Sequence, residues 1–166
     1  MKTNKCLSAA VGWLVGSAVL VLPLVSLAHV LWPNSGRVTS NYYSSRPYGY
    51  HQAIDIAGAY GEGIGATTYG TTQYKGYSGD YGNLVIVRHK SSYQSYYGHM
   101  SRFGTYAGEP ISHNETIGYE GSTGNSTGPH CHFEIRRYGS KLHFPASVGS
   151  HKMRGATIGQ SYPRMY

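Results

Sequence analysis

The sequence is poor in charge, in cysteine and in helical patterning. Only 13% of the 166 residues are charged while 40% are hydrophobic, a balance too apolar for a disordered tail. Two cysteines, Cys6 and Cys131, are too few for the disulfide framework of a small secreted scaffold. No stretch after residue 32 repeats its apolar residues every 3.6 positions, which argues against a helical protein. The length leaves room for one domain and scarcely a second.

Glycine and tyrosine are abundant instead, with 23 and 17 copies. Short runs of β-branched and aromatic residues alternate with clusters of Gly, Ser and Asn, the pattern of strands separated by turns. The sequence therefore predicts an all-β, compact antiparallel sheet domain. The expected strands cover residues 37–39, 53–56, 67–74, 83–88, 95–97, 116–119 and 131–136.

The N-terminal segment has the features of a secretory signal. Lys2 and Lys5 precede an uncharged, largely apolar stretch over residues 6–32, and Ala28 provides a small residue for cleavage. We expect a signal peptide over 1–28 and a single mature domain over 29–166, secreted or retained in the periplasm or cell wall. A retained membrane anchor is the alternative, because the apolar stretch is long enough to span a bilayer.

The net charge of +7 falls to +5 once the two N-terminal lysines are removed, so an anionic partner is favoured. Basic charge interleaved with tyrosine also suits single-stranded nucleic acid, but secretion argues against that partner. Strand propensity explains the tyrosines more simply. We expect a monomer with no nucleic-acid partner and no stable membrane association after cleavage.

A first candidate ligand pair is His51 and Asp55. Four positions apart, their side chains share one face of a strand and can also meet across a helical turn. An imidazole and a carboxylate suit Zn²⁺, although this spacing alone is a weak signal.

A second element, residues 130–134, reads His-Cys-His-Phe-Glu. On a strand His130 and His132 project to one face, and Cys131 projects to the other, where a buried cysteine behaves as a small hydrophobic residue. Glu134 shares the histidine face and is either a hydrogen-bond acceptor for a ligand or a surface carboxylate. His99 ends a short aromatic strand and gains interest only beside the other two elements.

Together these segments resemble the lysostaphin-type (LytM-like or LasA-like) zinc endopeptidases that cut peptide cross-links of bacterial peptidoglycan. The resemblance covers nearly the whole expected mature chain. It is carried by Trp32-Pro33, Gly36 to Ser40, the HxxxD motif at His51 and Asp55, Tyr81 to His89, Tyr97 to Ser101, Ile117-Gly118, and Gly121 to Glu134.

The resemblance implies a fold of the duplicated hybrid motif type, with a substrate groove formed by loops. It implies one Zn²⁺ per chain held by His51, Asp55 and His132, with a metal-bound water as the nucleophile. Two family histidines that handle protons correspond to His99 and His130. Three protein ligands and one open position are also what a catalytic zinc requires.

The family further places a tyrosine near the tetrahedral intermediate, in the loop before the first ligand. Tyr42, Tyr43, Tyr48 and Tyr50 crowd that loop here. Either one of them hydrogen-bonds the intermediate, or all four wall the substrate groove. Each is a candidate substrate-binding residue.

Some parts of the chain have no counterpart in the motif set. Four further histidines are expected to be structural or surface residues: His89, His113, His143 and His151. Residues 142–145 depart from the usual closing segment, and the tail over 146–166 is expected either to extend the sheet or to line the groove.

The expected function is that of a secreted zinc endopeptidase acting on peptidoglycan peptides, glycine-containing bonds among the candidate targets. The alternative is a non-catalytic peptidoglycan-binding or regulatory module of the same fold. Retention of all five motif positions favours the enzyme.

Overall fold

The computed structural model describes residues 29–47, 49–159 and 165. The expected signal peptide and Tyr48 lie outside this part of the chain. Within it the secondary structure is β with two short 3-10 turns, and no described helix is long and apolar enough to cross a bilayer. The prediction of an all-β, antiparallel domain is therefore confirmed.

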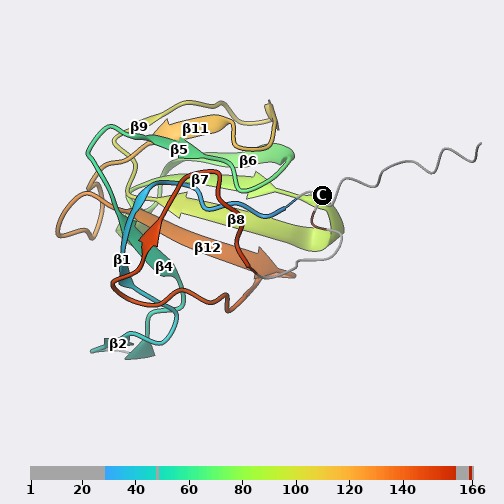
Figure 1. Cartoon of the computed structure of the whole chain (residues 1–166). Coiled ribbons are helices and arrows are strands. Elements are labelled where there is room, and N and C mark those ends of the chain that lie inside the picture. The colour runs from blue at the N-terminus through green and yellow to red at the C-terminus, as the bar shows by residue number, and fades with distance from the viewer. Residues whose placement is uncertain (1–28, 48, 160–164, 166) are drawn as a thin grey trace, which may run out of the picture.

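A large sheet contains β10 (Pro110–Ile111), β6 (Gly70–Tyr77), β7 (Asn83–Arg88), β8 (Tyr93–Gly98), β12 (Cys131–Arg137), β4 (Ile54–Ala57), β1 (Gly36–Ser40) and β14 (His151–Lys152), in that order. β13 (Ser140–Lys141) pairs with β12 beside this path. The 3-10 turns η1 (Gly79–Tyr81) and η2 (Lys90–Ser92) flank β7. The strand pairings of this sheet are antiparallel throughout the described residues (Figure 1).

A second sheet consists of β5 (Gly63–Gly65), β11 (Thr116–Tyr119) and β9 (Arg102–Phe103), and a separate hairpin pairs β2 (Ser45–Arg46) with β3 (Gly49–Tyr50). Ile64 and Ile117 of the second sheet join the same hydrophobic core as the large sheet. In Figure 1 the hairpin lies at the outer end of β1 and β4, away from the second sheet. The hairpin is thus placed beside one end of the central strands.

The core explains the side-chain alternation along β12. Cys131, Phe133 and Ile135 are fully buried on one face. The Phe133 ring packs 5.4 Å from Tyr97 and 5.3 Å from Phe144, centroid to centroid. Each such buried side chain contributes about 1.5–3 kcal/mol to folding. The interior position expected for Cys131 is confirmed, and the alternation turns His132 to the opposite face.

Two expectations about chain segments need adjustment or resolution. The strand expected from residue 67 begins only at Gly70. Thr67 bonds other segments instead: its side-chain hydroxyl donates to the Leu31 carbonyl at 2.6 Å, and its backbone N–H donates to Tyr97 Oη at 2.8 Å. The tail extends the sheet, since β14 pairs with β1 and Ile158 is buried in the core. Of the two roles open for the tail, the structure bears out sheet extension.

Candidate metal centre and catalytic groove

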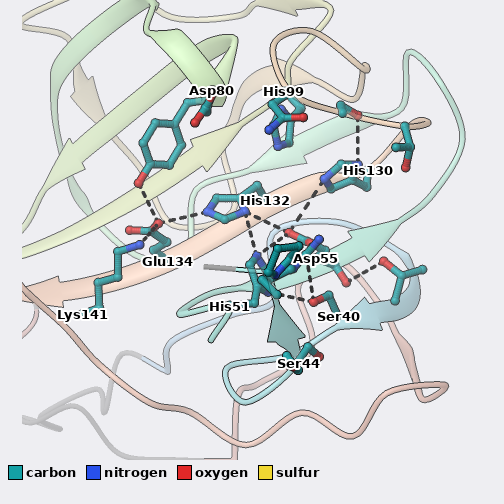
Figure 2. Close-up of a pocket in the computed structure, with 18 residues that line it drawn as sticks. Ser40, Ser44, His51, Asp55, Asp80, His99, His130, His132, Glu134 and Lys141 are labelled. Carbon is teal, nitrogen blue, oxygen red and sulfur yellow. Dashed lines mark hydrogen bonds and ion pairs between the residues drawn. The ribbon is translucent and has the colours of Figure 1, made fainter. Parts of the chain in front are cut away.

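A groove of about 900 Å³ crosses one end of the large sheet. Its walls come from the end of β1, the β2–β3 hairpin, turn η1 and the loop over 121–130, and its floor from β4 and β12. Figure 2 shows His51, His130 and His132 pointing toward Asp55 in this groove, with His99 farther from it. The chemistry-bearing residues of the sequence are therefore gathered in one place.

Strand register brings the potential ligands together. Asp55 on β4 lies directly opposite His132 on β12, and a register shift between Val38 and Ser40 sets Ser40 opposite Asp55 on the other side. Gly98 of β8 faces His132 across the next pair, and a Cβ there would lie 3.3 Å from that of His132. The paired positions on β1, β4, β12 and β8 thus form one row across the sheet, and this row fixes the positions of Asp55 and His132.

His51 completes the cluster from the segment just before β4. Its Nε2 lies 3.3 Å from Asp55 Oδ1 and 3.3 Å from His132 Nδ1, while His132 Nδ1 lies 2.9 Å from Asp55 Oδ1. Tetrahedral zinc with ligands at about 2.0–2.1 Å requires donor atoms about 3.3 Å apart. The spacing of these three atoms fits a zinc ion with little movement.

The second ring nitrogen of His51 and of His132 bonds an oxygen acceptor, and this bond sets which nitrogen carries the proton. His51 Nδ1 lies 2.9 Å from Ser40 Oγ, and His132 Nε2 lies 3.0 Å from Glu134 Oε1. A carboxylate accepts the N–H of His132, and the Ser40 hydroxyl oxygen can accept that of His51, so both lone pairs point inward. Two neutral imidazoles and one carboxylate form a donor set suited to Zn²⁺.

Charge at Asp55 is strongly favoured despite burial. Desolvation alone would raise the pKa of Asp55, but when the His132 and His51 rings carry protons toward it, their hydrogen bonds and charge hold that pKa far below its usual range. Arg46 adds an ion pair, with Nη2 3.0 Å from Asp55 Oδ2. Asp55 therefore remains a carboxylate, which is the form that binds a cation.

Glu134 resolves one of the alternatives left open by the sequence, because its side chain is fully buried rather than on the surface. Besides His132, it binds Tyr81 Oη at 2.9 Å, Lys141 Nζ at 2.8 Å and Arg136 Nε at 2.7 Å. Burial opposes its ionisation, but His132 and Lys141 outweigh burial and lower the pKa of Glu134 to about 2. An ionised acceptor is therefore fixed behind His132.

His99 and His130 line the groove beside the cluster, with ring centroids 4.5 Å apart. His99 Nδ1 lies 2.7 Å from the Thr123 carbonyl, and His130 Nδ1 lies 2.9 Å from that of Gly128. These carbonyls fix the proton on Nδ1 and leave each Nε2 as a proton acceptor. Burial lowers the pKa of His99 to about 4, so this ring is neutral at pH 7.

The backbone of His99 is itself unusual. Its φ is 61°, a left-handed conformation that few residues other than glycine adopt. The Tyr81 carbonyl accepts its N–H at 2.8 Å, so turn η1 and the loop at Thr123 hold this residue from both sides. Such strain persists where surrounding contacts over-determine a position, and it is common at functional sites.

The structure places the tyrosine candidates differently from the histidines. Tyr42 and Tyr43 pack against His143 at 5.2 and 4.8 Å between ring centroids, and neither is among the described groove-lining residues. Tyr50 is 69% exposed on the hairpin. Their proposed contact with an intermediate stays a prediction.

Sequence reasoning missed several contributors to the groove: Ser40, Arg46, Tyr81 and Lys141. Their contacts join distant segments, such as Arg136 Nη2 to Tyr81 Oη at 2.8 Å, 55 positions apart, and Tyr42 Oη to the Lys141 carbonyl at 3.5 Å, 99 positions apart. Ser40 and Tyr81 lie in the motifs over residues 36–40 and 81–89, and those motifs were the sequence signal that could have identified them. No local pattern identifies the partners.

The other histidines fit structural or surface roles. His89 is buried with Nδ1 2.7 Å from the Tyr69 carbonyl and Nε2 2.7 Å from Ser95 Oγ, and burial lowers its pKa to about 4. His113 Nε2 lies 2.7 Å from the His29 carbonyl. Neither residue lines the groove in the described part of the chain.

Comparison with known proteins adds independent information. The model of Peptidase family M23 matches residues 49–144, more than half of the chain. The DD-carboxypeptidase/endopeptidase Mpg of Neisseria meningitidis serogroup B is 38% identical over 115 residues, which cover 63% of this chain and 26% of that protein. The Murein hydrolase activator NlpD of Salmonella dublin is 37% identical over 112 residues, covering 67% of this chain and 29% of that protein.

Among solved structures, the catalytic domain of the antimicrobial peptidase lysostaphin from Staphylococcus simulans is similar with a TM-score of 0.55 and 25% identity. The alignment covers 71% of this chain and 87% of that domain. The fold implied by the sequence motifs is thus found among solved proteins. The matched region amounts to less than a third of the length of either sequence relative.

Proposed function

This chain belongs to peptidase family M23, and from that premise we propose that it is a zinc-dependent endopeptidase that hydrolyses peptide cross-links of bacterial peptidoglycan. The observation that carries the proposal is the convergence of three donor atoms from His51, Asp55 and His132 within 4.8 Å, each imidazole oriented by a second hydrogen bond. We assign these residues as the metal ligands. Bound there, Zn²⁺ supplies a Lewis acid that acidifies a water molecule and polarises the scissile carbonyl.

His130 and His99 then handle the protons. His130 Nε2 lies 3.8 Å from Asp55 Oδ1, beside the proposed ligands. This residue accepts the proton of the nucleophile at Nε2 and returns it to the leaving amine. Burial keeps His99 neutral, and its Nε2 is an acceptor that orients a proton-bearing group beside His130.

The groove suits an extended peptide. Polar walls from the hairpin, turn η1 and the loop over 121–130 offer backbone and side-chain partners above a floor formed by the large sheet. We further propose that residues 1–28 are removed and that the chain acts on the wall outside the cytoplasmic membrane. The net charge of +5 for residues 29–166 supports attraction to an anionic wall.

A second candidate function is activation of another wall hydrolase, favoured by the 37% identity to a murein hydrolase activator. An activator needs no turnover of its own. It would increase lysis only when a separate hydrolase is present.

One experiment tests both. The purified protein is assayed for zinc by metal analysis, and its digests of peptidoglycans with different cross-links are searched by mass spectrometry for new amino termini. We expect one zinc per chain and new termini at a cross-link, both lost in His132→Ala. Stoichiometric zinc without new termini, together with stimulation of an added hydrolase, would favour the activator. Absence of zinc binding in the intact folded protein would remove the basis of the enzyme proposal.

A further inference from the structure

Arg46 occupies an unusual place beside the metal centre. It lies on β2 of the hairpin, lines the groove, and has a side chain that is 49% exposed. Its Nη2 donates to Asp55 Oδ2 at 3.0 Å and to Ser40 Oγ at 3.0 Å. No other Arg46 contact occurs within the described residues, so the donors on Nε and Nη1 have no protein partner there.

The other cations lining or flanking the groove are already engaged. Lys141 Nζ and Arg136 both bind the buried Glu134, at 2.8 and 2.6 Å. Of the two cations that line the groove in the described part of the chain, Arg46 is the more exposed, at 49% of its side chain against 27% for Lys141. Asp80, the remaining acidic lining residue, belongs to turn η1 on another wall.

Metal binding strengthens the argument. A Zn²⁺ ion with one carboxylate and two neutral imidazoles leaves a centre of net charge +1, and Asp55 then shares its charge between the ion and Arg46. The ion pair no longer neutralises the guanidinium. An anionic group of the substrate is the natural partner for the charge and donors that remain.

Distance restricts which substrate group this is. Arg46 binds one oxygen of Asp55 while the other oxygen belongs to the donor cluster, so the guanidinium lies one carboxylate group from the metal position. In a peptide substrate, the residue after the scissile amide supplies the scissile nitrogen, and only its α-carbon separates that nitrogen from its own carboxyl group. A free carboxylate on that residue comes within one residue length, about 3.8 Å, of the reacting bond.

We propose that Arg46 binds a free α-carboxylate on the residue that follows the scissile amide, and so selects substrates that carry one over neutral glycine bridges. This inference rests on the proposed peptidase function and specifies its substrate class. Two sources supply such a carboxylate: the C-terminal D-alanine of a linear stem peptide, and the diamino acid of a D-alanine cross-link. In both, charge-assisted hydrogen bonds from the guanidinium position the amide over the metal centre.

The test compares matched substrates with the zinc-loaded protein. A linear stem ending in D-alanyl-D-alanine and a cross-linked dimer with a free diamino-acid carboxylate are each paired with the corresponding carboxamide. We expect kcat/KM to favour the carboxylate form of at least one pair by about tenfold or more. Arg46→Gln should reduce that preference by about 10- to 100-fold, mainly through KM, with Arg46→Lys intermediate. Arg102→Gln, which removes a cation stacked 3.3 Å from the Tyr119 ring centroid, is the matched control and should keep the preference.

A simpler role for Arg46 is to orient Asp55. In that case Arg46→Gln would lower zinc content or reduce cleavage of carboxylate and carboxamide by the same factor, and the inference would be wrong. Binding of the four peptides is also measured by calorimetry with zinc-loaded His130→Ala. Equal affinity for carboxylate and carboxamide would overturn the inference even if no substrate is cleaved, whereas absence of cleavage together with selective binding would count against the peptidase proposal alone.

Discussion

Glu120 provides a quantitative test of the folded core, because its carboxylate is fully buried without a cationic partner among the described residues. It accepts the Gly58 N–H at 2.5 Å and Asn34 Nδ2 at 2.8 Å, both neutral donors. Burial, with a smaller contribution from the like charge of Glu62, raises the pKa of Glu120 to about 7. Glu120→Gln removes the titration while keeping the size of the side chain.

The sign of the effect follows from proton binding. Between the ordinary pKa of 4.5 in the unfolded chain and about 7 in the folded chain, the folded state keeps a proton that the unfolded state releases. The contribution of Glu120 to the free energy of unfolding is therefore fully present at low pH. It decreases as the pH rises from 4.5 to about 7, and it no longer changes above that pH. Each pH unit within the window costs about 1.4 kcal/mol, so the loss between pH 5 and pH 8 is about 2.5 kcal/mol.

Urea unfolding at pH 5 and pH 8 measures this loss directly. We expect the wild-type protein to lose about 2.5 kcal/mol more than Glu120→Gln over this interval. Glu115→Gln, at a half-buried carboxylate that accepts the Ser112 N–H, serves as the control and should follow the wild type. Parallel pH dependences for the wild type and Glu120→Gln would refute the reasoning, since they would mean that Glu120 is ionised in the fold at no cost.

The remaining predictions concern the groove. His132→Ala should abolish both stoichiometric zinc and turnover; full zinc occupancy in this variant would contradict the ligand assignment. His99→Ala and His130→Ala should each reduce kcat by about 10²- to 10⁴-fold with zinc retained, and loss of zinc instead would make them ligands. Glu134→Gln should weaken zinc binding by about 10- to 100-fold in a competition titration, because the acceptor behind His132 loses its charge, whereas unchanged affinity would reduce Glu134 to a structural role. Lysis of whole walls should fall steeply towards 1 M salt, where the Debye length is about 3 Å, while cleavage of a short neutral peptide changes little; equal slopes would exclude electrostatic targeting.

Local sequence predicted the features that depend on strand periodicity. The strand at 83–88 was predicted to the residue because it contains the β-branched run Val85-Ile86-Val87 and follows a turn signal. Alternation also predicted that Cys131 and His132 face opposite sides of one strand. The two-residue strands, such as β2 and β13, were missed because they are too short to show a period of two.

Contacts between distant segments were beyond such reasoning. Nothing near Glu134 indicates that Tyr81 and Lys141 bind it, since those contacts exist only once η1, β12 and β13 are in place. The burial of Glu120 could not be predicted from the local sequence for the same reason. Its neighbours Asn34 and Gly58 lie 86 and 62 positions away.

The direct opposition of Asp55 and His132 on paired strands has a consequence for how a metal enters and leaves. These two donors are preorganised by the sheet, so capturing an ion costs little conformational entropy at either position. His51 lies outside the strands, next to the β2–β3 hairpin, and its backbone N–H bonds the Ser44 carbonyl at 2.8 Å. For the zinc site proposed above, the sheet therefore fixes two of the three donors, and release of the ion would depend on the segment that carries His51.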